Sequence, residues 1–101
     1  MGLIPPLNGL RLFEAVGRCG SFKLAAEELN ITPGAVIHGV NALEKWLGIE
    51  LFDRKRGLAL TQAGLDYLSY ISRALLMIAE GTNELLATDQ NTKGPPTLPP
   101  G

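Results

Sequence analysis

The sequence has little of what a secreted or membrane-embedded protein needs. It contains one cysteine, Cys19, which cannot form a disulfide within the chain and therefore fits a reducing compartment. No apolar run approaches the roughly 18–20 residues that span a bilayer. The first residues, Met-Gly-Leu-Ile-Pro-Pro, lack the basic and apolar regions of a secretory signal. We therefore expect a cytoplasmic protein.

The patterns of a catalytic or cofactor site are also missing from the sequence. There is no glycine-rich phosphate-binding loop and no nucleophile with a plausible general base. The single histidine, His38, has no second metal ligand near it in the sequence. We expect no enzyme activity and no cofactor in this segment.

A strong basic excess, which is common in DNA-binding domains, is absent as well. The formal net charge is −1, and residues 1–60 carry seven basic against six acidic side chains. With 46% hydrophobic and 19% charged residues, the 101-residue chain is typical of one folded globular domain. A nucleic-acid partner therefore has to be argued from the arrangement of residues, because composition alone does not indicate one.

What the sequence does contain is a series of apolar residues at three- and four-residue intervals, which predicts consecutive helices. The first helix begins at Leu7, after Pro5-Pro6, and ends in the region of Gly17 to Gly20. Ser21 then caps a second, short helix that ends at Leu29.

A tight turn at residues 30 and 31 leads to the third helix. Thr32 can cap this helix with its hydroxyl, and Pro33 suits the first helical position because it has no amide hydrogen to leave unpaired. The helix runs to about Leu47, where Gly48 ends it. Two helices joined by so short a turn are typical of a helix-turn-helix, whose second helix enters the major groove. The residues predicted to face the core are Leu7, Leu10, Leu12, Phe13, Val16, Ala25, Ala26, Leu29, Val36, Val40 and Leu43.

The periodicity changes after the third helix. Residues 49–53 and 58–60 are strand-like, and Arg54-Lys55-Arg56-Gly57 separates them, which predicts a β-hairpin with a basic tip. A three-helix core followed by such a hairpin is the element order of a winged helix-turn-helix, a mainly α fold. The basic tip would suit phosphate contact or entry into the minor groove.

Thr61 caps a long final helix that we expect to end at about Ala87. The sequence thus predicts a winged helix-turn-helix domain at 1–60, a linker and dimerisation helix at 61–87, and a flexible linker at 88–101. The apolar repeat of the long helix suits a seam between two copies, and the alternative is that it packs only on its own domain. The predicted seam residues are Leu68, Ile71, Leu75, Ile78, Thr82 and Leu85.

Dispersed motifs over residues 5–87 resemble the amino-terminal domain of LysR-type transcription regulators, and the opening stretch is similar to the glycine-cleavage regulator branch. The motifs are Pro5 to Arg11, Gly20-Ser21-Phe22, Ala25 to Leu29, Ala42-Leu43-Glu44, Leu47-Gly48, Leu51-Phe52 with Arg54, and Leu60 to Gly64. The resemblance implies a bacterial, sequence-specific binder of double-stranded DNA that forms a homodimer through the long helix. It also implies an effector domain outside this segment that binds a small molecule.

The residues expected to contact DNA lie at the start of the third helix and at the hairpin tip. They are Thr32, Pro33, Gly34, Ala35, Ile37, His38, Asn41, Arg54, Lys55 and Arg56. LysR-type regulators commonly have Gln, Ser or Arg at several of these helix positions. Here Pro33, Gly34 and Ile37 offer only close approach or an apolar contact with a thymine methyl. Asn41 stands where Lys or Arg is frequent, and its amide could read adenine with two hydrogen bonds.

Two other interpretations remain open at this level. One is an interaction module that pairs through the long helix and has lost DNA reading, which the weak net charge and the altered third helix would favour. The other is a winged-helix DNA binder of another family. Gel shifts with random duplex at low salt would separate the first alternative, because a non-binder shows no affinity there.

Overall fold

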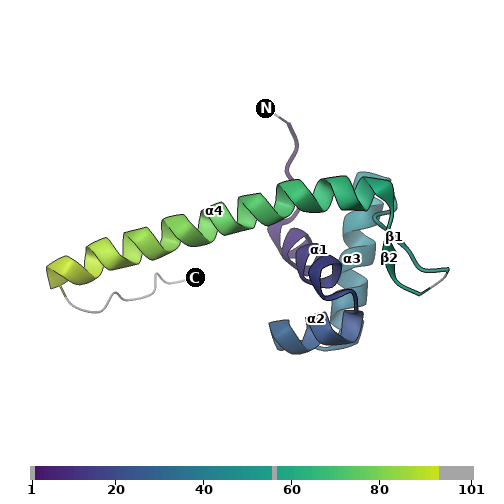
Figure 1. The fold of residues 1–101 in the computed structure, drawn as a ribbon, viewed down its shortest axis with the longest axis horizontal. Helices are drawn as coiled ribbons and strands as arrows, with labels where there is room; N and C mark the ends of the chain where they lie inside the picture. The colour runs from purple at the N-terminus through teal and green to yellow at the C-terminus, as the bar shows by residue number, and fades with distance from the viewer. Residues whose placement is uncertain (1, 56, 94–101) are drawn as a thin grey trace.

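The structure, a computed structural model, describes residues 2–55 and 57–93. Figure 1 shows three helices and a hairpin gathered around one end of a long helix, which projects away from them. The elements in chain order are α1 (Leu7–Cys19), α2 (Phe22–Leu29), α3 (Pro33–Leu47), β1 (Phe52–Asp53), β2 (Ala59–Leu60) and α4 (Gln62–Lys93). The mainly helical fold with a short antiparallel hairpin is the one predicted from the sequence.

Helix ends lie where the sequence places its caps. The side-chain oxygens of Ser21 and Thr32 each accept the backbone N–H three residues further on, both at 3.1 Å. Gly20 and Gly48 end α1 and α3 in the left-handed region, with φ of 68° and 71°. Asn30 takes the same conformation, with φ of 60°, in the turn between α2 and α3. These caps confirm the predicted helix-turn-helix.

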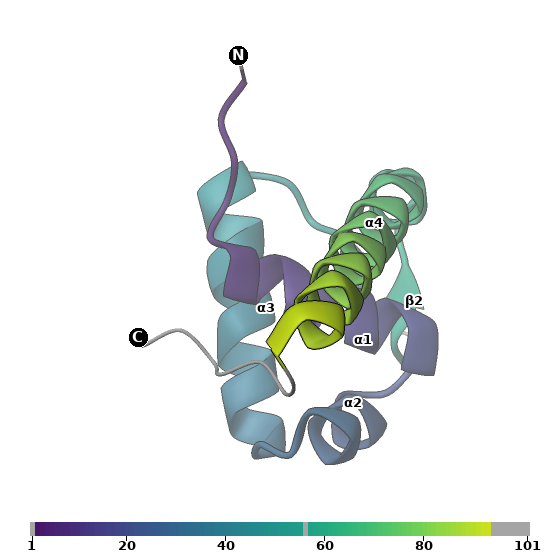
Figure 2. The same cartoon turned by 90° about the vertical axis from the view of Figure 1, so that its left-hand side faces the viewer.

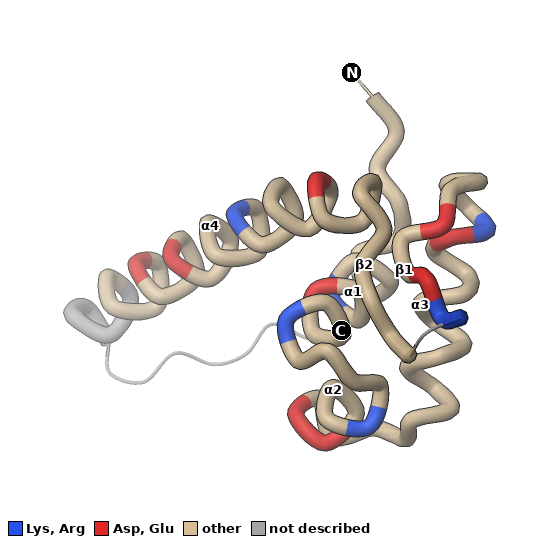
Figure 3. Tube along the Cα trace, turned by 45° about the vertical axis from the view of Figure 1, so that its right-hand side comes forward, with Lys and Arg blue, Asp and Glu red and all other residues tan. Residues whose placement is uncertain are grey.

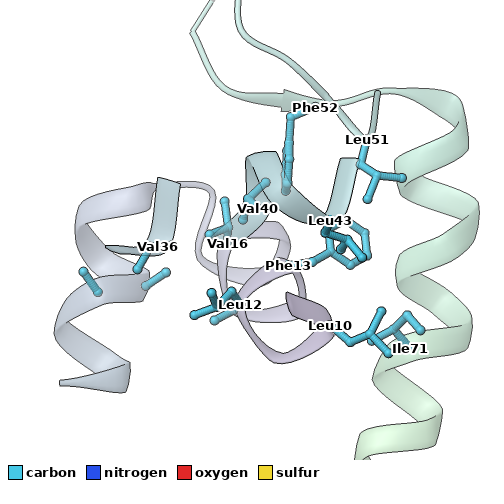
Figure 4. Close-up of a cluster of buried hydrophobic side chains, with 13 residues drawn as sticks. Leu10, Leu12, Phe13, Val16, Val36, Val40, Leu43, Leu51, Phe52 and Ile71 are labelled. Carbon is cyan, nitrogen blue, oxygen red and sulfur yellow. The ribbon is translucent and has the colours of Figure 1, made fainter. Parts of the chain in front are cut away.

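The core forms where α1 packs against α2, α3 and α4 (Figure 2). Phe13 is 0% exposed, and its ring centroid lies 5.6 Å from that of Phe52 and 5.7 Å from that of Tyr67, so it joins α1 to β1 and α4. Leu29 is only partly buried, and Leu7, in the first turn of α1, is exposed. The apolar repeat of α1 thus continues one turn beyond the core. The buried side chains, most of them labelled in Figure 4, are Leu10, Leu12, Phe13, Ala15, Val16, Ala25, Ala26, Val36, Val40, Leu43, Leu51, Phe52 and Ile71.

A glycine lies where α1 and α3 approach each other. A Cβ atom added at Gly39 would lie 2.1 Å from a methyl carbon of Leu12, so a larger residue there would force that buried side chain to move. The contact holds α3 against the core along one side and leaves its opposite side to solvent.

The hairpin is shorter than the sequence predicts. In β1 and β2, Phe52 pairs with Leu60 and Asp53 with Ala59, whereas the strands were expected over 49–53 and 58–60. Just before β1, the backbone N–H of Leu51 donates to the carboxylate of Glu44 on α3, which also accepts the N–H of Phe52. The N–H of Leu51 is therefore not available to extend the ladder towards residue 49.

Helix α4 begins at a dense set of hydrogen bonds centred on Thr61. The Thr61 hydroxyl accepts from Gly64 N–H at 3.0 Å and donates to the Glu50 carbonyl at 2.8 Å. The Thr61 N–H donates to the Leu51 carbonyl at 3.0 Å. A Cβ atom at Gly64 would lie 2.0 Å from that same carbonyl oxygen, so glycine is required where α4 crosses β1.

The other end of α4 differs from the prediction. The helix does not stop at about Ala87 but continues to Lys93, so the predicted linker at 88–101 begins too early. No glycine or proline interrupts the chain between Thr88 and Lys93, and the Thr88 hydroxyl donates to the Glu84 carbonyl at 3.0 Å inside the helix. Residues 94–101 lie outside the described residues. Among the helices described, none is long and apolar enough to cross a membrane.

Candidate nucleic-acid interface

The outer face of α3 holds the residues that the sequence predicts to contact DNA. Val36 and Val40 are both fully buried, so the residues between and after them turn outward. Ile37 is 37% exposed, and His38 and Asn41 are exposed as well. The structure therefore brings an apolar, an imidazole and an amide side chain together on one solvent-facing strip.

The first turn of α3 extends this strip with small, exposed residues. Pro33, Gly34 and Ala35 are all exposed, and a Cβ atom added at Gly34 would meet nothing within 4 Å. Thr32 caps the turn and occupies the N–H of Ala35. Together with the positive end of the helix dipole, the small side chains suit a close approach to a phosphate.

Glu44 joins the hairpin to α3. Its Oε2 atom accepts the backbone N–H of Leu51 at 2.7 Å and of Phe52 at 3.1 Å. Its Oε1 atom accepts from the Arg54 guanidinium at 2.9 Å. The carboxylate is mostly buried, so these three hydrogen bonds satisfy a charge that would otherwise be costly to desolvate.

Arg54 has two further partners besides Glu44. Its Nη1 atom donates to the Asn41 Oδ1 atom at 2.5 Å, and its guanidinium carbon lies 5.4 Å from the centre of the Phe22 ring. The guanidinium thus fastens the hairpin to α3 and α2. The sequence placed Arg54 at the basic tip as a phosphate contact. In the structure its side chain, which is 38% exposed, makes these contacts within the domain, and the phosphate contact stays a prediction.

Lys55, the next residue of the predicted basic tip, is exposed, and no side-chain contact within the described residues engages its ammonium group. Its backbone N–H donates to Asp53 Oδ1 at 3.0 Å, which stabilises the turn out of β1. Arg56 lies outside the described residues. Figure 3 shows basic positions at this hairpin and on α2, where the acidic positions lie on the other side of the helix.

Two glutamates on the far side of α2 and α1 are neutralised by one arginine. Arg18 binds Glu14 at 2.8 Å and forms a two-pronged contact with Glu28. The hydrogen bonds that Arg18 donates to Glu28 and Glu14 raise the pKa of Arg18, and the hydrogen bond that Glu28 accepts from Arg18 lowers the pKa of the Glu28 carboxyl. Because these acids are paired away from α3, the overall charge of −1 says little about the α3 surface.

The six predicted seam residues of α4 fall into two groups. Leu68, Ile71 and Leu75 face their own domain: Ile71 is only 8% exposed, lies beside Leu10 in Figure 4, and Leu68 contacts the region of Gly17. Ile71 is therefore covered within its own domain, whereas Leu68 and Leu75 are only partly buried, and the seam stays a prediction. The remaining three residues, Ile78, Thr82 and Leu85, lie on the exposed part of the helix.

Sequence reasoning missed the roles of Glu44 and Phe22. Neither residue has an unusual local pattern, and their contact with Arg54 depends on how the hairpin folds back onto α3. The one available signal was an acidic residue three positions after Asn41 on the same helix, with an arginine in the following hairpin.

Comparison with known proteins gives a family match and several similar regulators. Residues 7–65 match the model of the "Bacterial regulatory helix-turn-helix protein, lysR family". The chain is 43% identical over 96 residues to the glycine cleavage system transcriptional activator of Escherichia coli K12, covering 94% of this chain and 31% of that protein. It is 44% identical over 80 residues to the uncharacterized HTH-type transcriptional regulator y4mQ of Sinorhizobium fredii NGR234, covering 78% of this chain and 27% of that one.

Solved structures of DNA complexes show the same fold. The DNA-binding domain of BenM bound to catB site 1 DNA superposes with a TM-score of 0.76 at 28% identity, covering 89% of this chain and 99% of that one. The DNA-binding domain of CbnR in a DNA complex gives a TM-score of 0.72 at 29% identity, covering 84% and 99%. The chain spans less than a third of the length of the curated relatives described above.

Proposed function

The chain belongs to the lysR family of bacterial regulatory helix-turn-helix proteins and binds double-stranded DNA sequence-specifically, and we propose that it does so as a homodimer with α3 in the major groove. In this arrangement the outer strip of α3 faces base edges, and the hairpin reaches the flanking backbone. Lys55 is then the wing residue available for a phosphate.

One observation carries the proposed docking. The first half of α3 keeps Val36 and Val40 fully buried while Ile37, His38 and Asn41 project to solvent. A recognition helix must be held rigidly by one face and free on the other, since base contacts require a fixed position. The Glu44 network supplies the second fixed point by holding the hairpin beside α3.

The homodimer is supported by the outer part of α4. With 32 residues α4 is about 48 Å long at 1.5 Å per residue, and the three-helix core covers only its first half. Beyond that half the helix exposes large apolar side chains: Met77 is 73% exposed and Leu85 is 68% exposed. A second copy of the same helix would cover them, with Ile78, Thr82 and Leu85 in the contact.

The whole protein would extend well beyond this domain. We propose that it regulates transcription in the bacterial cytoplasm in response to a small molecule bound by another domain, and that this segment has no catalytic role. The greater length of the curated relatives supports the additional domain, and the printed name of the E. coli relative, a transcriptional activator, supports regulation.

Binding measurements at several salt concentrations test the proposed function. A duplex enriched from a random pool should bind the 101-residue chain at least about a thousandfold more tightly than random duplex. Log affinity should fall linearly with log salt for both. If neither duplex binds at low salt, the proposal fails and the interaction module is correct. If the two duplexes bind equally, α3 does not read sequence.

A further inference from the structure

We propose that Arg54 orients the side-chain amide of Asn41 so that Asn41 selects guanine, and not adenine, in the major groove. This inference rests on the proposed docking of α3, and it names one specificity determinant within that docking. It also replaces the sequence-based expectation that Asn41 reads adenine with two hydrogen bonds.

The position of the Arg54 guanidinium is set by groups that do not depend on Asn41. Glu44 Oε1 accepts from its Nη2 atom at 2.9 Å, and the Phe22 ring lies beneath it at 5.4 Å. Glu44 is in turn fixed by two backbone N–H groups at the start of β1. With these contacts made, the Nη1 atom points at α3 and donates to Asn41 Oδ1 at 2.5 Å.

This contact decides which end of the amide is free. A guanidinium can only donate hydrogen bonds, so the atom that meets it has to be the amide oxygen. The Asn41 Nδ2 group, with its two N–H donors, is then the end left for another partner. Asn41 is exposed, so that partner can come from solvent or from DNA.

The bases differ in what they offer to such a donor. Adenine is read by an amide that accepts from N6 and donates to N7 at the same time. Here the oxygen needed for N6 already binds Arg54, and the positive guanidinium beside it disfavours a second N–H donor. Guanine presents only acceptors at this edge, N7 and O6, and either of them can accept an N–H of Asn41.

The arrangement depends on an amide at position 41. A Lys or Arg at position 41 could not accept a hydrogen bond from Arg54, because both side chains only donate. A basic residue would instead be repelled by the guanidinium. The Arg54–Asn41 contact is therefore a feature of this sequence, and it does not follow from the fold.

Selection of bound duplexes from a random pool tests the inference, with the parent chain and four variants compared at one salt concentration. The parent should enrich guanine at one position per half-site. Asn41→Ala should reduce that preference roughly ten- to a hundredfold and leave the other positions unchanged. Lys45→Ala, at an exposed position of α3 outside the strip, is the control, and it should leave the guanine preference intact.

Asn41→Asp gives the sharpest outcome, because the aspartate has the same shape and still accepts from Arg54. Its free end is an acceptor, so the preference at that position should change from guanine to cytosine, whose N4 is a donor. Arg54→Lys keeps a positive charge but removes the guanidinium fork, which should release the amide and move the preference towards adenine. Thermal unfolding of each variant confirms that it is folded before selection.

The possible failures are distinguishable. A parent that enriches no sequence overturns the proposed function together with this inference. A parent that enriches a clear site with adenine at the Asn41 position, or Asn41→Ala and Asn41→Asp profiles identical to the parent profile, overturns only the inference. A guanine preference that Arg54→Lys leaves unaltered shows that Arg54 does not orient the amide.

Discussion

The outer half of α4, taken as residues 76–93, and the body formed by residues 2–55 and 57–75 use the same kind of sequence in opposite ways. Both carry large apolar residues at three- and four-residue spacing. In the body these side chains cover one another, as at Phe13, which has no exposed surface. In the outer half they are open to solvent, as at Met77 and Leu85. The apolar period predicts a helix in both regions but does not say what covers it.

The difference also separates two kinds of stability. Burial in the body lies within one chain, so it contributes to folding at any protein concentration. Burial of the outer half would require a second chain and would therefore depend on concentration. Mutations in the two regions should act on different measurable quantities.

Replacing Phe13 by Ala should have the largest effect on the body. The ring joins α1 to Phe52 and Tyr67, and its removal leaves a cavity that the surrounding helices fill only in part. We expect the free energy of unfolding to fall by about 3–5 kcal/mol, measured by urea denaturation. Leu85→Ala, at a 68% exposed position, is the control and should cost far less in dilute solution. Equal losses of unfolding free energy for the two variants would contradict the distinction between the buried body and the exposed outer half of α4.

Replacing Leu85 by Asp should abolish the homodimer without unfolding the body. A carboxylate in an apolar contact between helices loses its hydration without gaining a partner. Sedimentation should show a monomer where the parent is a dimer, with an unchanged thermal transition when both are monomeric. Glu80→Ala, another exposed substitution on α4, is the matched control and should remain dimeric. A Leu85→Asp chain that stays dimeric at micromolar concentration would refute the proposed contact.

Replacing Thr32 by Ala should destabilise the body by about 1 kcal/mol, the usual value of a helix cap. The Thr32 side chain accepts the N–H of Ala35, a group that otherwise has no partner within α3. Thr88→Ala in the outer half is the control: the Thr88 hydroxyl only donates to a carbonyl inside α4, and its loss should be close to neutral. Chemical denaturation of both variants measures the loss of unfolding free energy. A loss for Thr88→Ala as large as that for Thr32→Ala would contradict the assigned role of the Thr32 cap.

The smallest effect should come from acidic pH. Arg18 lowers the pKa of Glu28 below the ordinary 4.5, so the folded state binds a proton less readily there than the unfolded state does. The resulting stabilisation is present above pH 4.5 and is lost as the pH falls through the lowered value. Arg18→Gln should therefore flatten the decline of stability below pH 4.5, as followed by urea denaturation at a series of pH values. A decline as steep as that of the parent would mean that Glu28 contributes nothing.

Local chemistry predicted most of the fold. Ser21, Thr32 and Gly48 set helix ends because a cap depends on residues within one turn of the chain. The ends of the hairpin were predicted less well, because Glu44, from another element, takes the hydrogen bonds of the first strand. The end of α4 was predicted too early, because polar residues alone do not prevent an established helix from continuing.

The candidate site was likewise predicted only in part from the sequence. The outward direction of Ile37, His38 and Asn41 follows from the helical period once Val36 and Val40 are assigned to the core. The contacts of Arg54 within the domain could not be predicted, because its three partners come from α2 and α3 and meet only in the folded chain. The same is true of Leu68 and Ile71, whose burial depends on where α1 lies against α4.

The junction at Thr61 and Gly64 has a mechanical consequence. Three hydrogen bonds through Thr61 and the close crossing at Gly64 tie the start of α4 to the residues before β1. The start of α4 and the wing therefore form one connected unit, which α1 also holds through Ile71. A displacement of this part of α4 would be passed to the wing and, through Glu44, to α3.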